Sequence, residues 1–230
     1  MLILKKEFAD QKSKINIYFE HLKEYDSEKD LRGNKIVINT TQKASAVLVL
    51  YNLIESMTSK LLKLIHDKVM NDNFSYFEFN DSIRKTVFVY YKKILDENDT
   101  EKYHSRIEDF YFLINNKNKI NLRYDELTDI YQLFSGNLDA REIRNIFKNK
   151  YGFKLNENEL IAPVLKRIRE GRNKLAHGNI SFEEYGRDLS IPDLLSMKDK
   201  VFKFIDALIV KVELYLSGKI YKKTEYRKSI

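Results

Sequence analysis

Apolar residues recur at intervals of three and four along almost the whole chain, which is the spacing of one face of an α-helix. The chain has only 7 glycines and 2 prolines, and both prolines, Pro163 and Pro192, come late. A β-sandwich needs frequent turns, and turns usually contain these two residue types. The sequence therefore predicts an all-α fold with long helices. Because 43% of its residues are hydrophobic, the chain can also form a sizeable core.

Several of the predicted helices have recognisable end signals. Asp139 and Glu142 have the spacing of a capping box, and Asn156 is a candidate cap for the helix that follows. Gly178 supplies a C-terminal stop for that second helix, and Ser181 is a candidate cap for one short turn. The predicted helices span about 5–29, 42–70, 81–96, 101–115, 125–134, 139–150, 156–176 and from 192 onward, and the stretch 36–38 lies outside them.

The chain has no internal repeat, low-complexity linker or break in composition. We therefore expect a single domain over residues 1–230. The long helices at its two ends are expected to form a helical bundle. Residues 71–135 are expected to form extra helices that are inserted in the middle of this bundle.

The charge and the cysteine count limit the classes of partner and compartment. The net charge is +7, which permits a polyanionic partner, although a composition biased towards lysine explains the charge equally well. The chain has no cysteine, so disulfides and thiolate metal sites are excluded and the reducing cytoplasm is expected. The apolar run Met1-Leu-Ile-Leu is too short for a signal peptide or a membrane span, so no membrane association is expected.

The histidines suggest no metal site. His21, His66 and His104 are scattered singly along the chain, without the spacing that metal ligands show. No glycine-rich segment has the pattern of a phosphate-binding loop either. We therefore expect neither a metal nor a cofactor.

Arg172 is the unusual residue of the predicted helix 156–176, because it lies in the middle of an apolar stripe. A buried guanidinium is costly unless an anion accompanies it. That anion can be a carboxylate, the surface of a second subunit or a ligand phosphate. Glu55, on the long helix 42–70, is a candidate partner, and a simple buried ion pair remains an alternative to a functional role. The apolar stripe consists of Ile161, Val164, Leu165, Ile168 and Leu175.

His177 is expected at the C-terminus of the same helix. It lies about 140° around the helix from Arg172 and roughly 7–8 Å further along it, so the two do not share a face. Asn173 and His177, four residues apart, do share one. The negative end of the helix dipole favours the protonated imidazolium, and such a histidine can act as a general acid or base. The alternative is that His177 only caps the helix.

The segment Arg172-Asn-Lys-Leu-Ala-His177 resembles the Arg-x4-His signature of the HEPN superfamily. Three blocks are similar to one branch of this superfamily, the MAE type: Tyr51-Asn-Leu-Ile-Glu-Ser56, Ser135-Gly-Asn-Leu-Asp-Ala-Arg141, and the stretch from Arg172 to Arg187. The resemblance extends from about residue 40 to the last helix. Proteins of this type are encoded in prokaryotic conflict loci, namely toxin–antitoxin, restriction and abortive-infection systems.

The resemblance implies a HEPN-like bundle that forms a homodimer, in which both motifs line one cleft and cleave RNA without a metal. In that chemistry the ribose 2′-hydroxyl attacks the adjacent phosphate. His177 would move the proton and Arg172 would stabilise the charge on the phosphate. Asn173 would orient the phosphate or His177, and Glu55 would hold Arg172. Further RNA contacts are expected from Lys174, Arg141 and Arg144.

The implied biological role is that of a toxin or antiviral effector, restrained by an antitoxin or another regulatory partner. Some relatives of this type do not cleave RNA. A non-catalytic module that binds nucleotides, RNA or protein in the same cleft therefore stays open as an alternative, and so does a helical scaffold without a ligand.

Overall fold

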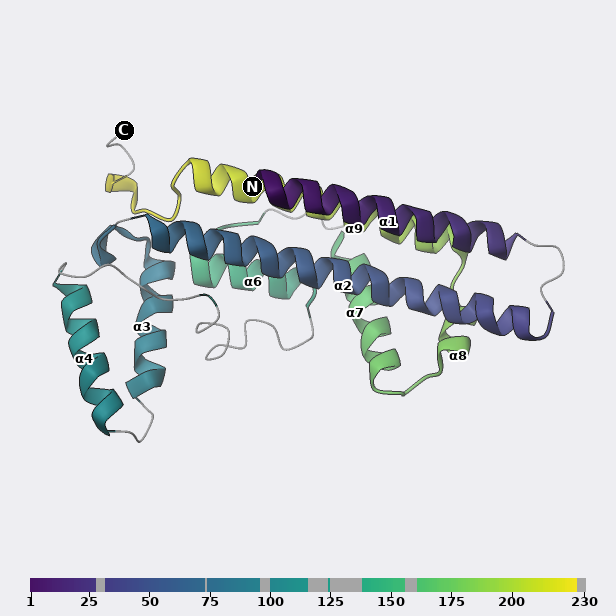
Figure 1. Ribbon diagram of the computed structural model, residues 1–230, viewed down its shortest axis with the longest axis horizontal. Coiled ribbons are helices and arrows are strands. Elements are labelled where there is room, and N and C mark those ends of the chain that lie inside the picture. Colours follow the sequence, from purple (N-terminus) through teal and green to yellow (C-terminus); the bar gives the residue numbers. More distant parts are fainter. Residues whose placement is uncertain are drawn as a thin grey trace. The chain divides into compact units, whose positions relative to one another are not determined.

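The computed structural model describes residues 1–27, 32–72, 74–95, 100–115, 124, 138–155 and 161–226 (Figure 1). The elements of these segments are helical, apart from an isolated antiparallel bridge between Phe79 and Lys222, so the expected all-α class is confirmed. The helices are α1 (Leu2–Asp26), α2 (Asn34–Asn71), α3 (Asp81–Leu95), α4 (Thr100–Ile114), α6 (Ala140–Tyr151), α7 (Ile161–Ala176), α8 (Phe182–Arg187) and α9 (Ile191–Ser217), with short 3-10 helices η1 (Tyr76–Glu78) and η2 (Thr224–Tyr226).

One predicted boundary is wrong by about two turns. Residues 36–38 belong to α2, which begins at Asn34 and not near residue 42. Gly33 adopts a positive φ of 53° just before the helix, and the Thr40 hydroxyl donates to the carbonyl oxygen of Ile36 at 2.9 Å. Three consecutive β-branched residues lower helix propensity only slightly, so the continuing helix overrides it. The predicted helix 125–134 and the predicted cap Asn156 lie outside the described residues.

The chain divides into two compact units, and each consists of several stretches of sequence. The first unit contains residues 1–60, 137–141 and 157–209, and the second contains 61–136, 142–156 and 210–230. The helices α2 and α9 contribute to both units. Whether the whole chain is one domain with an insertion at 71–135 stays a prediction.

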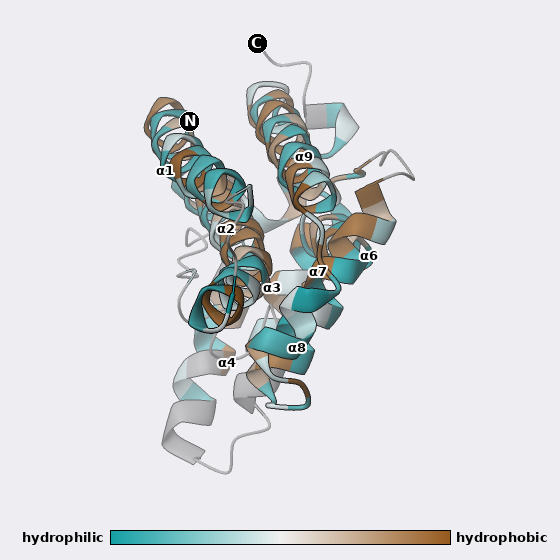
Figure 2. Ribbon diagram, turned by 90° about the vertical axis from the view of Figure 1, so that its right-hand side faces the viewer, coloured by the Kyte–Doolittle hydropathy of each residue, from teal (hydrophilic) through white to brown (hydrophobic). Residues whose placement is uncertain are grey.

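In the first unit, α1 runs antiparallel to its neighbours α2 and α9. The Tyr18 hydroxyl of α1 donates to the carbonyl oxygen of Gln42 in α2 at 2.7 Å. On the other side, the ring of Phe8 meets that of Phe202 in α9 edge to face, with centroids 6.2 Å apart. Buried apolar side chains lie between the helices, and hydrophilic residues cover the outer faces of the same helices (Figure 2). The amphipathic pattern of the sequence thus becomes the core of this unit.

The short helix α8 is fixed against α2 by a glycine. Ser181 caps α8, as expected, because its hydroxyl oxygen accepts a hydrogen bond from the Glu184 N–H at 3.1 Å. Gly186 lies so close to α2 that a Cβ atom there would meet the backbone carbonyl of Thr40. The absence of a side chain at Gly186 therefore lets the segment that follows α7 pack tightly in this unit (Figure 1).

In the second unit, Asn80 joins three segments. Its side-chain oxygen accepts from the Ile83 N–H at 3.0 Å, which caps α3. Its amide group donates to the carbonyl oxygens of Tyr151 and Ile220 at 3.0 and 3.2 Å. The Tyr215 hydroxyl donates to the same Tyr151 oxygen at 2.7 Å. These bonds hold the start of α3, the end of α6 and the segment after α9 together.

We expect a methyl group to cost more stability at Gly186 than at Gly178, because Gly186 lies against the backbone of α2. We expect Gly186→Ala to lower the free energy of unfolding by about 3 kcal/mol, because backbone cannot move aside as a side chain can. Gly178→Ala should cost only about 1 kcal/mol, because Gly178 has a positive φ but open space around its Cα. Urea unfolding followed by circular dichroism measures both. Equal stability of the Gly186→Ala and wild-type proteins would contradict the packing described here.

Candidate functional site

The signature segment forms the last turn and a half of α7 and the turn that follows it. The Asn179 N–H donates to the carbonyl oxygen of Lys174 at 3.0 Å, and the Gly178 N–H donates to that of Leu175 at 3.2 Å. Gly178 has a φ of 66°. These bonds form a Schellman motif, so the expected stop at Gly178 is confirmed. His177 is the capping residue just outside the helix, and its side chain is exposed.

Arg172 lies half-buried, with its guanidinium over an aromatic ring. The guanidinium carbon lies 5.0 Å from the centroid of the Tyr51 ring in α2. One of its nitrogens, Nη1, donates to the side-chain oxygen of Asn173 at 3.1 Å. Its neighbours on the apolar side of α7, Ile168 and Leu175, are buried. Arg172 is thus placed at the edge of the core by contacts with groups that carry no net charge.

Tyr51 is the buried centre of this arrangement. Its side chain is 0% exposed, and its hydroxyl oxygen accepts a hydrogen bond from the Leu138 N–H at 3.2 Å. Burial raises the pKa of the Tyr51 hydroxyl and the Leu138 N–H opposes this effect, while the charge of Glu55 raises the pKa and that of Arg172 lowers it. Tyr51 is therefore a neutral phenol near pH 7, and both charged residues lie within electrostatic reach of it.

The two residues expected to support the site, Glu55 and Asn173, differ in their contact with Arg172. Among the described residues no ion pair joins Glu55 to Arg172, because the ring of Tyr51, one turn earlier on α2, occupies the place next to the guanidinium. The side-chain oxygen of Asn173 accepts from Arg172, while its backbone oxygen accepts from the His177 N–H at 3.1 Å. Asn173 thus contacts both signature residues, and Glu55 lies half-buried nearby.

A second arginine on α7 also has a partner, which the sequence pattern does not indicate. Arg169 lies one turn before Arg172 on α7 and forms an ion pair with Asp139, the residue before α6. Both side chains are largely buried, with exposed fractions of 25% and 14%. The spacing of three residues could have placed Arg169 on the face of Arg172, but only the fold supplies its partner. Of the two arginines Arg169 and Arg172, it is therefore Arg169 whose charge is compensated by a carboxylate.

The three residues expected to contact RNA are all exposed. Lys174 lies on α7, two residues after Arg172, and Arg141 and Arg144 lie on α6. Arg141 belongs to the first unit, as the signature segment does, whereas Arg144 belongs to the second. The first unit thus contains Lys174 and Arg141 together with Arg172 and His177.

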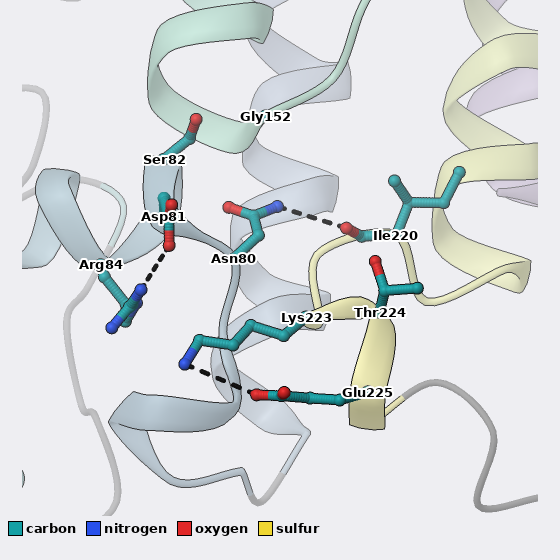
Figure 3. A pocket seen from close by; sticks show the side chains of 9 residues that line it. All are labelled: Asn80, Asp81, Ser82, Arg84, Gly152, Ile220, Lys223, Thr224 and Glu225. Carbon is teal, nitrogen blue, oxygen red and sulfur yellow. Dashed lines mark hydrogen bonds and ion pairs between the residues drawn. The ribbon is translucent and has the colours of Figure 1, made fainter.

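A separate cleft of about 670 Å³ lies in the second unit (Figure 3). Its charged groups compensate one another, because Arg84 pairs with Asp81, and Lys223 lies 3.8 Å from Glu225. None of the predicted site residues lines it, so we assign it no ligand. The lining residues are Asn80, Asp81, Ser82, Arg84, Gly152, Ile220, Lys223, Thr224 and Glu225.

The described segments show no sign of a metal site or of a membrane span. They contain no group of three or more histidine, aspartate or glutamate side chains arranged as metal ligands. In the same segments, no helix combines the length and the apolar character that crossing a membrane requires.

Comparisons with known proteins extend these observations. A family model described as MAE_28990-like HEPN matches residues 3–221, which include α7, the signature segment and Tyr51. Searches of curated proteins and of solved structures gave no match. The matched region covers nearly the whole chain, and the all-α architecture agrees with it. The chain therefore belongs to the MAE_28990-like HEPN family.

Proposed function

We propose that this protein is a metal-independent endoribonuclease of the HEPN type, with Arg172 and His177 as its catalytic residues. The observation that supports this proposal most is the state of Arg172. Its guanidinium is half-buried, yet within the described part of the chain it contacts only the neutral groups of Tyr51 and Asn173. A half-buried cation without a carboxylate is suited to bind an anion, and a phosphodiester is the anion that the family chemistry implies.

In the proposed reaction the 2′-oxygen of a ribose forms a bond to the adjacent phosphorus. The bond between that phosphorus and the 5′-oxygen of the next nucleotide breaks. The imidazole of His177 takes the proton of the 2′-hydroxyl and then, as the imidazolium, gives a proton to the leaving oxygen. Arg172 donates to the non-bridging oxygens, where negative charge increases in the transition state. The products are a 2′,3′-cyclic phosphate and a 5′-hydroxyl end.

The proposal includes a homodimer. On one helix the directions of Arg172 and His177 differ by about 140°, so the two side chains of one chain do not point to the same phosphate on an ideal helix. A twofold axis can bring Arg172 of one protomer opposite His177 of its partner. Exposure of His177 at the helix end leaves it accessible for such an arrangement.

The biological role that we propose is that of a toxin or antiviral effector in the cytoplasm, restrained by a regulatory partner protein. This role rests on the resemblance to proteins of prokaryotic conflict loci. The alternative is a module that binds RNA or nucleotides without cleaving them, and the same uncompensated guanidinium would serve it. Cleavage assays separate the two functions.

The first test is RNA cleavage by the purified protein in the presence of EDTA. We expect cleavage that leaves cyclic-phosphate ends, and we expect Arg172→Ala and His177→Ala to lower the rate roughly 10²- to 10⁴-fold while both variants stay folded. His104→Ala is the matched control, because His104 is also exposed but lies on α4 in the second unit. RNA binding without cleavage would favour the non-catalytic module, and full activity of folded His177→Ala would remove its catalytic role.

The second test asks whether the two residues act across a dimer. Arg172→Ala and His177→Ala proteins, each inactive, are unfolded together and refolded at equal concentration. Random pairing makes half of the dimers mixed, and each mixed dimer has one complete Arg172–His177 pair out of two. We therefore expect about a quarter of the wild-type rate to return. No recovery, with mixed dimers verified by mass spectrometry, would show that the residues do not pair across the axis in this way.

A further inference from the structure

We infer that Tyr51 is a positioning residue for the Arg172 guanidinium, which it holds by stacking so that the N–H groups stay free for the phosphate. This inference rests on the proposed function. Tyr51 is fully buried in α2, and its ring centroid lies 5.0 Å from the guanidinium carbon of Arg172. The face of an aromatic ring attracts a cation through its quadrupole.

A neutral partner has a different effect from a carboxylate. A carboxylate binds a guanidinium edge-on and occupies its donors, as Asp139 does with Arg169. A ring that stacks on the guanidinium leaves the donors in the plane of the group available. Among the described residues, the Arg172 guanidinium donates one hydrogen bond, from Nη1 to the side-chain oxygen of Asn173. Arg172 is thus held in place while keeping both its charge and most of its five donors.

The backbone of α7 is placed to make this stacking possible. Gly171 immediately precedes Arg172; a Cβ atom there would meet the Tyr185 hydroxyl of α8 and would also lie 3.2 Å from Cγ1 of Val47 in α2. Val47 is one turn before Tyr51 on α2, so the close approach at Gly171 brings α7 against the turn of α2 that carries Tyr51. The phenol is fixed in turn, because its hydroxyl accepts from the Leu138 N–H. Both partners of the stack are therefore held by the packing around them.

Stacking and stability can be separated with two substitutions. Tyr51→Phe keeps the ring but leaves the buried Leu138 N–H without its acceptor, so we expect lower stability with a kcat within about 2-fold of the wild type. Tyr51→Leu removes the ring, and we expect kcat to fall roughly 3- to 30-fold at nearly unchanged KM. If kcat instead fell in both variants in proportion to their loss of stability, Tyr51 would have only a structural role.

Because Tyr51→Leu leaves space in the core and can fail to fold, a second series keeps the shape of the ring. Tyr51 is replaced by phenylalanine and then by phenylalanine with one and with three ring fluorines, which withdraw electron density from the face. We expect kcat to fall stepwise with fluorination, while the melting temperature changes little. An unchanged kcat across the series would overturn the stacking role. In the Arg172→Ala background the same series should have no effect, because Tyr51 acts through Arg172.

An NMR measurement tests the inference without relying on catalysis. In protein with ¹⁵N-labelled arginine, the Arg172 Nε–H signal is identified by its loss in Arg172→Lys. Stacking on a ring shifts this proton upfield, so we expect the shift in the wild type and in Tyr51→Phe. In the fluorinated variants the shift should become smaller, because a weaker attraction lets the guanidinium leave the face of the ring more often. Absence of the upfield shift in the wild type would overturn the inference even if RNA is cleaved. If RNA is not cleaved but the shift is present, the proposed nuclease fails and the positioning of Arg172 by Tyr51 stands.

Discussion

The interaction on which the site depends is the contact between a guanidinium and the face of a buried phenol ring. Burying an arginine costs free energy unless other groups replace the water around it. Arg172 meets this requirement with the ring of Tyr51 and the amide of Asn173 and not with a carboxylate among the described residues. This arrangement retains the positive charge of Arg172 at the edge of the core. A buried ion pair would have stabilised the same residue but would have reduced its attraction for an anion.

The remaining helices of the first unit keep this contact in place. Helix α1 packs against α2 and α9, while Tyr51 is buried on the side of α2 that faces α7. Gly186 allows α8 to approach the backbone of α2 closely, and Gly171 leaves room on α7 for the Tyr185 side chain of α8 and for Val47 of α2. The pair of Arg169 and Asp139 joins α7 to the segment before α6, and this segment also supplies the Leu138 N–H. Long-range packing thus determines the geometry of a short motif.

Much of the fold could be predicted from local pattern, because helical periodicity and end signals depend on residues close in sequence. The capping role of Ser181 and the stop at Gly178 are confirmed for this reason. Residues 36–38 were wrongly placed outside a helix, because their low helix propensity is a weaker effect than the continuation of α2.

The partners within the site could not be predicted in the same way. Periodicity showed that Arg172 lies in an apolar stripe, but it did not show which residue of α2 faces it. Glu55 was the charged candidate, whereas Tyr51, one turn earlier, makes the contact. The pair of Arg169 and Asp139 joins residues 30 positions apart, and no local pattern indicates such a pair. Which residues meet across two helices depends on how far one helix is shifted along the other. The sequence pattern of each helix does not determine this shift.

The helix end at His177 has a consequence for how the two signature residues can adapt. The half-buried Arg172 is held by Tyr51 and Asn173. The imidazole of His177 is exposed, and only the backbone of its turn is fixed, by the Schellman bonds. In the proposed nuclease, the group that would bind the phosphate is therefore held more firmly than the group that would move the proton. This difference suits a nuclease that must bind the phosphate, which is the same in every nucleotide. It also allows nucleotides of different size on either side of that phosphate.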